Sequence, residues 1–388
     1  MIEVRLITNI AGILAFRDQY DSFIKECENA VPYCLSGWLE SMLEVWCRGI
    51  RCHKHSDNLA FLIAEENGQM VALAPFLLEQ KGVKQLHLNR LYWLGDIVRP
   101  LLKVEEMDFL LIDESYRDKC IVAFYKFLLN DKNLGWDVIE LGYAVKSSPN
   151  LRRFLELFPQ SQIADDKVVS AKIDLPDSFE KYLAGLAAKY RSDLRRCRKL
   201  LDAEFSSVEF FSTNNMADSL LSEAVRLHKI RQQEHLVSGR DRYSLFEDKK
   251  SSSAFFKLLD WSANYGIARH FWLKLDGKIA AFVLGFAFKE IYFAKVMSFD
   301  PAFKVYSPAK LLILEVIKEE IELHHTSLID LGIGLNHVKK NFSTRLAPLV
   351  NMSIQRPRMV SRAKLTWRNT LKPVKRIVQK HCLRPVAH

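Results

Sequence analysis

The fold is decided by residues 271–342, which read FWLKLDGKIAAFVLGFAFKEIYFAKVMSFDPAFKVYSPAKLLILEVIKEEIELHHTSLIDLGIGLNHVKKNF. Asp276-Gly277 is a pair that readily adopts positive φ angles at the tip of a two-residue hairpin. The apolar run from Ile279 to Phe288 is too short to span a membrane but suits a buried strand. Strands over Ile291–Phe299 and Ser327–Leu331 flank a predicted helix. This order of strands, hairpin and helix predicts a mixed α/β sheet.

The connection between the third strand and the helix has the features of an anion site. It reads Lys304-Val305-Tyr306-Ser307-Pro308-Ala309, and the helix continues from Lys310 to about His324. Ser307 is a good N-cap residue, and Pro308 suits the first helical turn, where its missing N–H costs nothing. Unpaired backbone N–H groups and the helix dipole face such a loop. The segment therefore predicts either a phosphate site or simply a well-capped helix.

The same stretch resembles the GNAT-type acyltransferases, and most closely their branch associated with cellulose biosynthesis, the CelD-like proteins. The motifs that carry the resemblance are Asp276-Gly277 with Ala281-Phe282, Asp300-Pro301-Ala302-Phe303, Tyr306-Ser307-Pro308 with Leu311, and Asp330, Gly334, Lys339 and Phe342. Leu335 and Val338 stand where that branch usually has an acidic residue and a tyrosine. In such enzymes the loop into this helix grips the pyrophosphate of acetyl-CoA.

The resemblance implies a site for acetyl-CoA, or another acyl-CoA, and no metal. The implied cofactor-binding residues are Val296, Met297, Ser298, Lys304, Val305, Tyr306, Ser307, Pro308, Ala309 and Lys310. Backbone N–H groups near Val296–Ser298 would stabilise the oxyanion that develops on the acyl group. The acceptor must also lose a proton to a base. The candidate catalytic residues are Asp330, His337, Lys339 and His228, of which Lys339 is favoured because its spacing matches the family.

Two parts of the chain repeat the same order of elements. Glu66–Ala72 parallels Leu275–Ala281, and Val138–Gly142 parallels Leu328–Gly332, with a helix before the second member in both copies. The first copy is longer, with its extra residues around Asp96–Asp113. One α/β unit present twice explains this order. The alternative is that two unrelated mixed sheets share similar hairpins.

The resemblance supports the duplication, because the family looks like a tandem pair of GNAT folds, as in the peptidoglycan Fem-type transferases. We expect two tandem GNAT-like domains of the α/β (mixed α+β) class, each a mostly antiparallel sheet flanked by helices. The expected units are an N-terminal domain over residues 1–165, a C-terminal domain with the acyl-CoA site over 166–355, and a basic helical tail over 356–388. Asp113-Glu114 precede the first copy's helix, so we expect the first domain to lack the cofactor.

Two further helices are expected before the second copy. Ser178–Asp202 predicts one long helix with a strongly basic face. Leu194 and Leu201 of this helix are expected to pack inward. That face is either a solvated surface, a wall of the cofactor site or a contact to an anionic acceptor. Met216–Gln233 predicts a second helix, and the polar loop Ser238-Gly239-Arg240 beyond it could cover the acceptor site.

The net charge of +10 comes from the C-terminal tail. Residues 356–388 contain ten Lys or Arg and no Asp or Glu, so the remaining 46 basic residues balance all 46 acidic ones. Trp367, Leu371, Val374 and Val378 fall on one helical face, with basic residues around them. The segment 360–388 therefore predicts a contact to an anionic membrane surface or an acidic partner, a helix packed on the body, or a solubilising tail. The neutral body and the lack of a reading motif argue against nucleic acid.

Cysteine usage and the N-terminus predict a cytoplasmic protein. The seven cysteines are odd in number and show no paired spacing, which argues against a disulfide framework. Cys47, Cys52, His53 and His55 cluster, but their spacing fits no common zinc site. Met1-Ile2-Glu3-Val4 shows no secretory signal. We expect a bacterial-type cytoplasm, with a place at the inner face of the membrane if the tail binds lipid.

The leading functional hypothesis is an acetyl-CoA-dependent N- or O-acyltransferase. Its acceptor would be a sugar, a polysaccharide precursor or a small amine. One alternative is a Fem-like transfer of an amino acid from aminoacyl-tRNA. The other is a catalytically degenerate GNAT-fold scaffold for polysaccharide biosynthesis, which Leu335 and Val338 favour.

Overall fold

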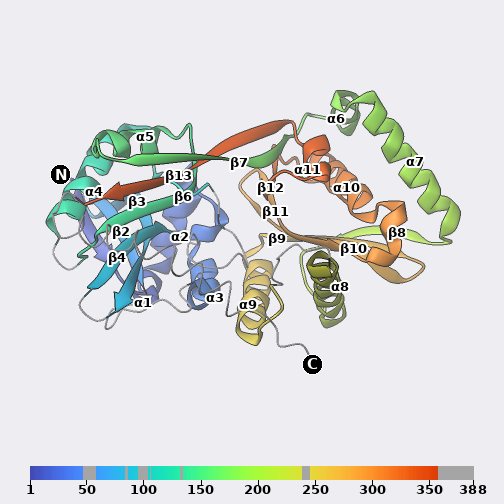
Figure 1. The fold of residues 1–388 in the computed structure, drawn as a ribbon, viewed down its shortest axis with the longest axis horizontal. Helices are drawn as coiled ribbons and strands as arrows, with labels where there is room; N and C mark the ends of the chain where they lie inside the picture. The colour runs from blue at the N-terminus through green and yellow to red at the C-terminus, as the bar shows by residue number, and fades with distance from the viewer. Residues whose placement is uncertain are drawn as a thin grey trace.

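The computed structural model describes residues 1–46, 58–83, 86–94, 104, 106–131, 134–237 and 245–356. These residues form one 13-stranded mixed sheet flanked by helices on both faces (Figure 1). The strand order is β1-β2-β3-β4-β6-β13-β7-β12-β11-β10-β9-β8, with β5 paired to β3. Among the described strands, only the pairs β4–β6 and β11–β12 are parallel. The predicted fold class, a mixed and mostly antiparallel sheet flanked by helices, is confirmed.

The strands divide into two sets. The first half contains β1 (Glu3–Ile7), β2 (Leu59–Glu66), β3 (Gln69–Val83), β4 (Leu86–Trp93), β5 (Leu110–Leu111) and β6 (Val138–Val145). The second half contains β8 (Val208–Thr213), β9 (Ala268–Leu275), β10 (Lys278–Phe288), β11 (Ile291–Phe299) and β12 (Leu328–Ile333). Two long strands, β7 (Gln162–Asp174) and β13 (Arg345–Gln355), lie between the sets.

The helices cover the two faces of the sheet in the same way in both halves (Figure 1). On one face lie α1 (Ile10–Leu14), α2 (Arg17–Glu26), η1 (Pro32–Cys34), α3 (Ser36–Trp46), α8 (Asp218–Val237) and α9 (Lys249–Tyr265). On the other lie α4 (Arg117–Asn130), α5 (Pro149–Glu156), α6 (Phe179–Gly185), α7 (Ala188–Glu204), α10 (Pro308–Glu322) and α11 (His337–Phe342). The 3₁₀ turns η2 (Glu114–Tyr116) and η3 (Pro301–Tyr306) precede α4 and α10.

The two halves repeat one another in register. Arg90–Tyr92 of β4 pair in parallel with Val138–Glu140 of β6, and Ile291–Phe293 of β11 pair in parallel with Leu328–Asp330 of β12. Both expected hairpin tips have positive φ angles at their two central residues, 53° and 75° at Asn67-Gly68 and 45° and 80° at Asp276-Gly277. Such angles define the type I′ turn of a tight hairpin. The sheet therefore supports the predicted duplication.

The two long central strands are exchanged between the halves. β13, the last of the described strands, pairs with β6 of the first half, whereas β7, which ends the first copy, pairs with β12 of the second. β7 and β13 also pair with each other in antiparallel fashion from Arg345–Lys172 to Ser353–Gln162. The predicted domain boundary at residue 165 falls inside β7. Each half is completed by a strand from the other copy.

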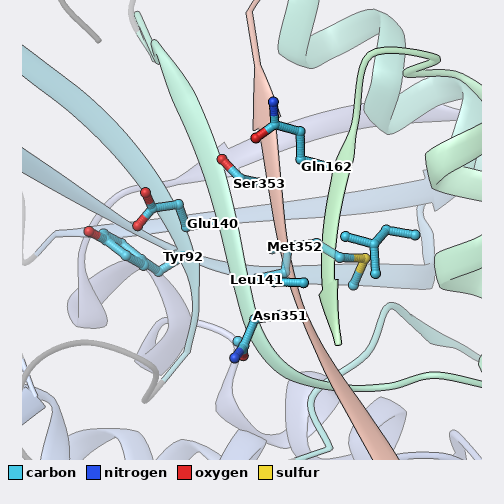
Figure 2. Close-up of a pocket in the computed structure, with 10 residues that line it drawn as sticks. Tyr92, Glu140, Leu141, Gln162, Asn351, Met352 and Ser353 are labelled. Atoms are coloured by element: carbon cyan, nitrogen blue, oxygen red, sulfur yellow. The ribbon is translucent and has the colours of Figure 1, made fainter. Parts of the chain in front are cut away.

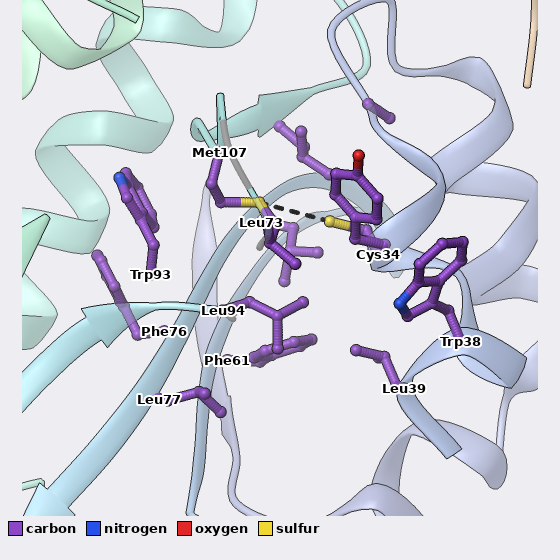
Figure 3. Close-up of a cluster of buried hydrophobic side chains, with 14 of the residues drawn as sticks. Cys34, Trp38, Leu39, Phe61, Leu73, Phe76, Leu77, Trp93, Leu94 and Met107 are labelled. Atoms are coloured by element: carbon purple, nitrogen blue, oxygen red, sulfur yellow. Dashed lines mark hydrogen bonds between the residues drawn. The ribbon is translucent and has the colours of Figure 1, made fainter. Parts of the chain in front are cut away.

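Aromatic side chains dominate the core of the first half. Phe76 stacks on Trp93 with ring centroids 4.9 Å apart, and Phe109 meets Trp93 edge to face at 5.1 Å. The Sγ of Cys34 lies 3.7 Å from the Sδ of Met107 across the same core (Figure 3). This sulfur contact ties the segment around Met107 to η1. A second core, beneath α10, joins β11 and β12 to α6 and α7.

Several element predictions need correction. The helix expected over Ser178–Asp202 is two helices, α6 and α7, because the chain is extended at Leu186 and Ala187. The Arg191 guanidinium donates hydrogen bonds to the carbonyls of Leu183, Ala184 and Leu186, which stabilises the break. The residues from Ile10 to Glu26 likewise form two helices, α1 and α2.

Part of the sequence analysis lies outside the described residues. The cluster from Cys47 to His55, the loop Ser238–Arg240 and the tail beyond Arg356 all fall there, so the tail's predicted membrane contact stays a prediction.

Among the described helices, none has both the length and the apolar composition that crossing a membrane requires.

We predict that truncating Met352 on β13 destabilises the first half. Met352 is 4% exposed and packs in the first-half core, so Met352→Ala should lower the free energy of unfolding by about 2–5 kcal/mol. Leu346, on the same strand but 43% exposed, is the matched control, and Leu346→Ala should change it by less than about 0.5 kcal/mol. Urea unfolding followed by tryptophan fluorescence measures both. Equal losses in the two variants would contradict the exchange of β13.

Candidate active site

The strands of the second half part at a defined point. β11 and β12 pair only from Ile291 to Phe293, although β11 continues to Phe299. The register between β10 and β11 shifts near Gly285, where Lys295 is passed over. No described strand pairs with the edge of β11 beyond Phe293 on the side of β12. Backbone groups on that edge therefore face the opening between the two strands.

Three charged side chains meet at the mouth of this opening. Asp330 is the last residue of β12 that pairs with β11, and its Oδ2 lies 3.5 Å from the Nζ of Lys172 on β7. The same Nζ lies 2.5 Å from the Oε2 of Glu106. Their side chains are between 6% and 13% exposed. Two acids and one lysine from three distant parts of the chain thus share a buried space, which we call the Glu106–Lys172–Asp330 cluster.

The carboxylate of Asp330 is held in place by its own loop. It accepts hydrogen bonds from the backbone N–H of Gly332 at 2.6 Å and from the Ser170 hydroxyl at 3.5 Å. Ile329 and Leu331 point into the core beneath α10, so Asp330 projects from the opposite face of the sheet. Lys172 and Ser170 project from the same face, because Lys172 pairs directly with Asp330.

The carboxyl of Glu106 has a raised pKa. Burial raises the pKa of its carboxyl, and the nearby charge of Asp330 raises it further, whereas Lys172 opposes the shift. Its Oε1 is buried and has no hydrogen-bond partner within the described part of the chain. A carboxyl with a raised pKa and an unsatisfied oxygen is the kind of group that accepts a proton near neutral pH.

The segment that carries Glu106 is rigidly held by the first half. The N–H of Glu106 donates to the carbonyl of Tyr143 at 3.0 Å, and its φ of 63° is positive. Two residues later, Asp108 accepts hydrogen bonds from Ser148 at 2.6 Å and Asn29 at 3.3 Å. The first half therefore positions a carboxylate at the opening of the second half.

The structure separates the four predicted catalytic residues. Asp330 and Lys339 lie at the end of β12, where the Lys339 ammonium donates to the carbonyls of Gly332 and Ile333, both at 3.0 Å. His337 is exposed at the start of α11. His228 lies on α8 against the ring of Phe246, and burial lowers its pKa to about 4, so it is neutral at pH 7. Asp330 alone among the four belongs to the charged cluster.

The predicted anion loop is a 3₁₀ turn, η3, followed directly by α10. Ser307 occupies the N-cap position, but its φ of 56° is left-handed and its side chain makes no cap hydrogen bond. A side-chain N-cap needs an extended backbone, which explains the difference from the prediction. The N–H of Ser307 donates to Lys304, the N–H of Lys310 donates to Ser307, and Pro308 has none. This leaves the N–H of Ala309 as the donor that could meet a phosphate.

The side chains around this helix start are also engaged. Lys310 lies 2.6 Å from Asp193 on α7 and over the ring of Tyr190, whereas Lys304 lies 3.2 Å from Glu234 on α8. Val305 is exposed, and Tyr306 packs edge to face on Phe205. The remaining predicted cofactor residues lie on β11. There Val296 and Ser298 are buried and Met297 is half-buried, and the Ser298 hydroxyl donates to the carbonyl of Leu227.

Sequence reasoning missed two members of the cluster. Lys172 had a usable signal, since a lysine among the buried apolar positions Ala171 and Ile173 of a central strand requires a buried counter-charge. Glu106 had none, because it lies outside any periodic segment and is brought to Lys172 only by the exchanged strands. The cluster combines Glu106 of the first copy with Asp330 of the second, so the sequence of either copy alone does not reveal it.

Comparisons with known proteins identify the second half. Residues 188–340 match the model of a family described as the acetyltransferase (GNAT) domain. This part of the chain is a GNAT-fold domain. The match spans less than half of the sequence, so it assigns the domain and not the whole protein. A search of curated proteins found no match.

Solved structures are similar over almost the whole chain. FemX is 12% identical with a TM-score of 0.63, and the similarity covers 91% of this chain and 97% of FemX. A protein of unknown function from Bacteroides thetaiotaomicron is 13% identical with a TM-score of 0.54, covering 92% of this chain and 100% of that one. At such low identity these similarities establish the fold alone. They show that the arrangement of both halves occurs in other proteins.

We predict that removing Lys172 makes stability depend on pH. Lys172→Met leaves Glu106 and Asp330 facing each other without the ammonium that lies between them, at a cost of about 3–5 kcal/mol near neutral pH. The lysine is also what lowers the pKa of Glu106, so in the variant this pKa rises further. A raised carboxyl pKa gives stability that is present at low pH and lost as pH rises through it. The variant should therefore be destabilised less at about pH 5 than at about pH 8.

Urea unfolding at the two pH values measures this effect. Lys181→Met is the matched control, because Lys181 and its partner Asp177 are 63% and 89% exposed and their separation should change little at either pH. A Lys172 variant whose loss is the same at both pH values would show that the cluster does not titrate as described.

Proposed function

We propose that the protein is an acyltransferase that moves an acyl group to an amine or hydroxyl acceptor at the opening between β11 and β12. The single observation that carries the proposal is the position of Glu106. Its carboxyl, with a raised pKa, stands where the two strands of a GNAT-fold domain part. Acyl transfer needs a proton acceptor at that place, since the nucleophile must be deprotonated as it attacks.

The chemistry divides among the residues of the cluster. Glu106 accepts the proton of the acceptor while the acceptor's nitrogen or oxygen bonds to the acyl carbon. Lys172 and Asp330 are positioning residues. Lys172 holds the Glu106 carboxylate in place and lowers its pKa, whereas the charge of Asp330 raises that pKa. Backbone N–H groups on the open edge of β11 would donate to the oxyanion that forms on the carbonyl oxygen. The proton then leaves with the departing group of the donor.

The donor in the leading form of the proposal is acetyl-CoA or another acyl-CoA, with a saccharide or small amine as acceptor. The N–H of Ala309 and the side chains of Lys304 and Lys310 are the groups that would meet its phosphates. Both lysines would first leave their carboxylate partners. The Lys304–Glu234 pair is exposed and contributes little, so it can be exchanged for a phosphate. Because both lysines are engaged, the start of α10 fits the phosphates of CoA only in part, and binding of CoA is the first point to test.

A second candidate is a Fem-like transfer from aminoacyl-tRNA. It is favoured by the outer face of α7, where Lys189, Arg195 and Lys199 are exposed and make no ion pair within the described residues. α7 lies at the outer end of the second half in Figure 1, where a large anionic donor could reach it. A protein that binds neither donor would instead fit the third hypothesis, a scaffold without catalysis.

We predict that Glu106→Gln lowers kcat by about 10²–10⁴-fold, because the proton acceptor is lost. In the unsubstituted protein, activity should rise with pH through the raised pKa of Glu106, above the usual range for a glutamate, and this acidic limb should disappear in the variant. Glu114→Gln, an exposed acid of the same segment, is the matched control and should retain full activity. A pH profile of Glu106→Gln that keeps its acidic limb would remove Glu106 from the mechanism.

We predict that the protein binds CoA at the start of α10. Calorimetric titration of CoA should give saturable binding, which Ala309→Asp should weaken at least about tenfold, because a carboxylate there repels phosphate. Ala217→Asp, an exposed change just before α8, introduces the same charge at another helix start and should leave CoA affinity unchanged. No heat of binding with CoA, together with a measurable affinity for tRNA, would transfer the proposal to the second candidate.

A further inference from the structure

The first half contains a cavity of about 500 Å³ beside its own parallel strand pair (Figure 2). It is lined by Tyr92 on β4, by residues of β6, by residues of β13 and by the start of β7. The lining residues are Tyr92, Glu140, Leu141, Gly142, Gln162, Ile163, Ala164, Asn351, Met352 and Ser353. Its volume lies within the usual range for sites of small organic ligands, about 300–1,000 Å³.

A row of polar side chains runs across these four strands. Tyr92 pairs with Glu140, Glu140 pairs with Ser353, and Ser353 pairs with Gln162. Directly paired residues project from the same face of a sheet, so the four side chains form a continuous line. Figure 2 shows Tyr92 next to Glu140, and Ser353 next to Gln162. Because each member stands on a regular strand, the row is a preformed surface rather than a property of one mobile loop.

The row is the counterpart of the charged cluster in the second half. By register, Tyr92, Glu140, Ser353 and Gln162 correspond to the second-half residues Phe293, Asp330, Lys172 and Arg345. The duplication therefore placed an acid at the mouth of both strand pairs. The two cations of the second half are replaced in the first by a hydroxyl and an amide.

This replacement decides the charge of the ligand. Glu140 is the one charged residue among the described residues that line the cavity. It forms an ion pair with Arg90, which also lies 3.5 Å from Glu79, so this arginine is committed to carboxylates. A phosphate or carboxylate ligand would meet the Glu140 carboxylate without a cation of the lining to balance it. The cavity is therefore unsuited to CoA, to nucleotides and to other anions.

We propose that this cavity binds an uncharged sugar residue. The Ser353 hydroxyl and the Gln162 amide make no side-chain hydrogen bond within the described part of the chain, and both can donate and accept. The Glu140 carboxylate accepts from hydroxyl groups, and its side chain is 30% exposed. Hydroxyl, amide and carboxylate groups in a line match the successive hydroxyls of a pyranose.

The sugar site is separate from the proposed acyl-transfer site. Gln162 and Lys172 stand ten residues apart on β7, about 30 Å at the usual rise of a strand. One monosaccharide cannot touch both, so the cavity would hold either an independent sugar or a distant residue of a longer chain. The proposal rests on the first half alone, and it stands or falls independently of acyl transfer.

The test is a binding experiment with the full-length protein and no acyl donor. Calorimetry and saturation-transfer NMR should show saturable binding of N-acetylglucosamine, and at least about tenfold weaker binding of glucose 6-phosphate because of its charge. Ser353→Tyr, which fills the centre of the row, should abolish sugar binding, and Gln162→Ala should weaken it about tenfold. Gln160→Ala, an exposed glutamine just outside the cavity, is the matched control and should leave binding unchanged.

Three results would overturn the proposal. They are the absence of saturable sugar binding up to the solubility of the sugar, an affinity that neither Ser353→Tyr nor Gln162→Ala changes, and tighter binding of glucose 6-phosphate than of the neutral sugar. Gln162 is exposed at the start of β7, so its alanine variant should fold even if Ser353→Tyr does not. A fourth result would also overturn it: an acetyl dipeptide that binds with sugar-like affinity and displaces the sugar would assign the cavity to peptides instead.

Discussion

The antiparallel pairing of β7 with β13 is the constraint on which the rest of the structure depends. It joins the six strands of the first half and the five of the second into one continuous sheet and gives each half a strand from the other copy. Without β7 and β13, β6 and β12 would each present an unpaired edge. The exchange also fixes the relative register of the halves, since a slip of one residue would turn every side chain of β7 to the opposite face.

This fixed register is what brings the charged cluster together. Lys172 reaches Asp330 across the β7–β12 pair, and Glu106 arrives from the first half. Burying one lysine between two acids costs desolvation energy that a buried apolar contact would not. Such a cluster is therefore weak evidence for stability and better evidence for function. The Oε1 of Glu106, which has no hydrogen-bond partner among the described residues, points the same way. The pairing that holds the fold together is also what assembles the candidate site.

Local sequence patterns predicted most of the fold. The two hairpin tips and the repeat could be recognised because glycine turns and apolar runs are short-range signals. The strands β8 and β13 were missed, the second because Pro348 interrupts its pattern, yet Pro348 pairs with Val169 in the sheet. The exchange of β7 and β13 could not be predicted from the sequence of one copy. It depends on whether each strand pairs with β6 or with β12, and the two edges are equivalent in the two copies. Glu106 became a candidate only once that choice was known.

The two halves have diverged in charge rather than in shape. The acid at the end of the parallel pair is present in both, as Glu140 and Asp330. The next two residues of the row are neutral in the first half, Ser353 and Gln162, and cationic in the second, Lys172 and Arg345. The helix starts differ in the same sense, because Asp113 and Glu114 precede α4 whereas Lys304 and Lys310 flank the start of α10.

Within the second half the two lysines are not equivalent. Lys304 is 65% exposed and can leave Glu234 at little cost, whereas Lys310 is 13% exposed, lies over Tyr190 and forms an ion pair that solvent screens less. A phosphate approaching α10 would therefore recruit Lys304 first. It would recruit Lys310 only if it also displaced Asp193, so release of α7 from α10 is the step that would complete an anion site.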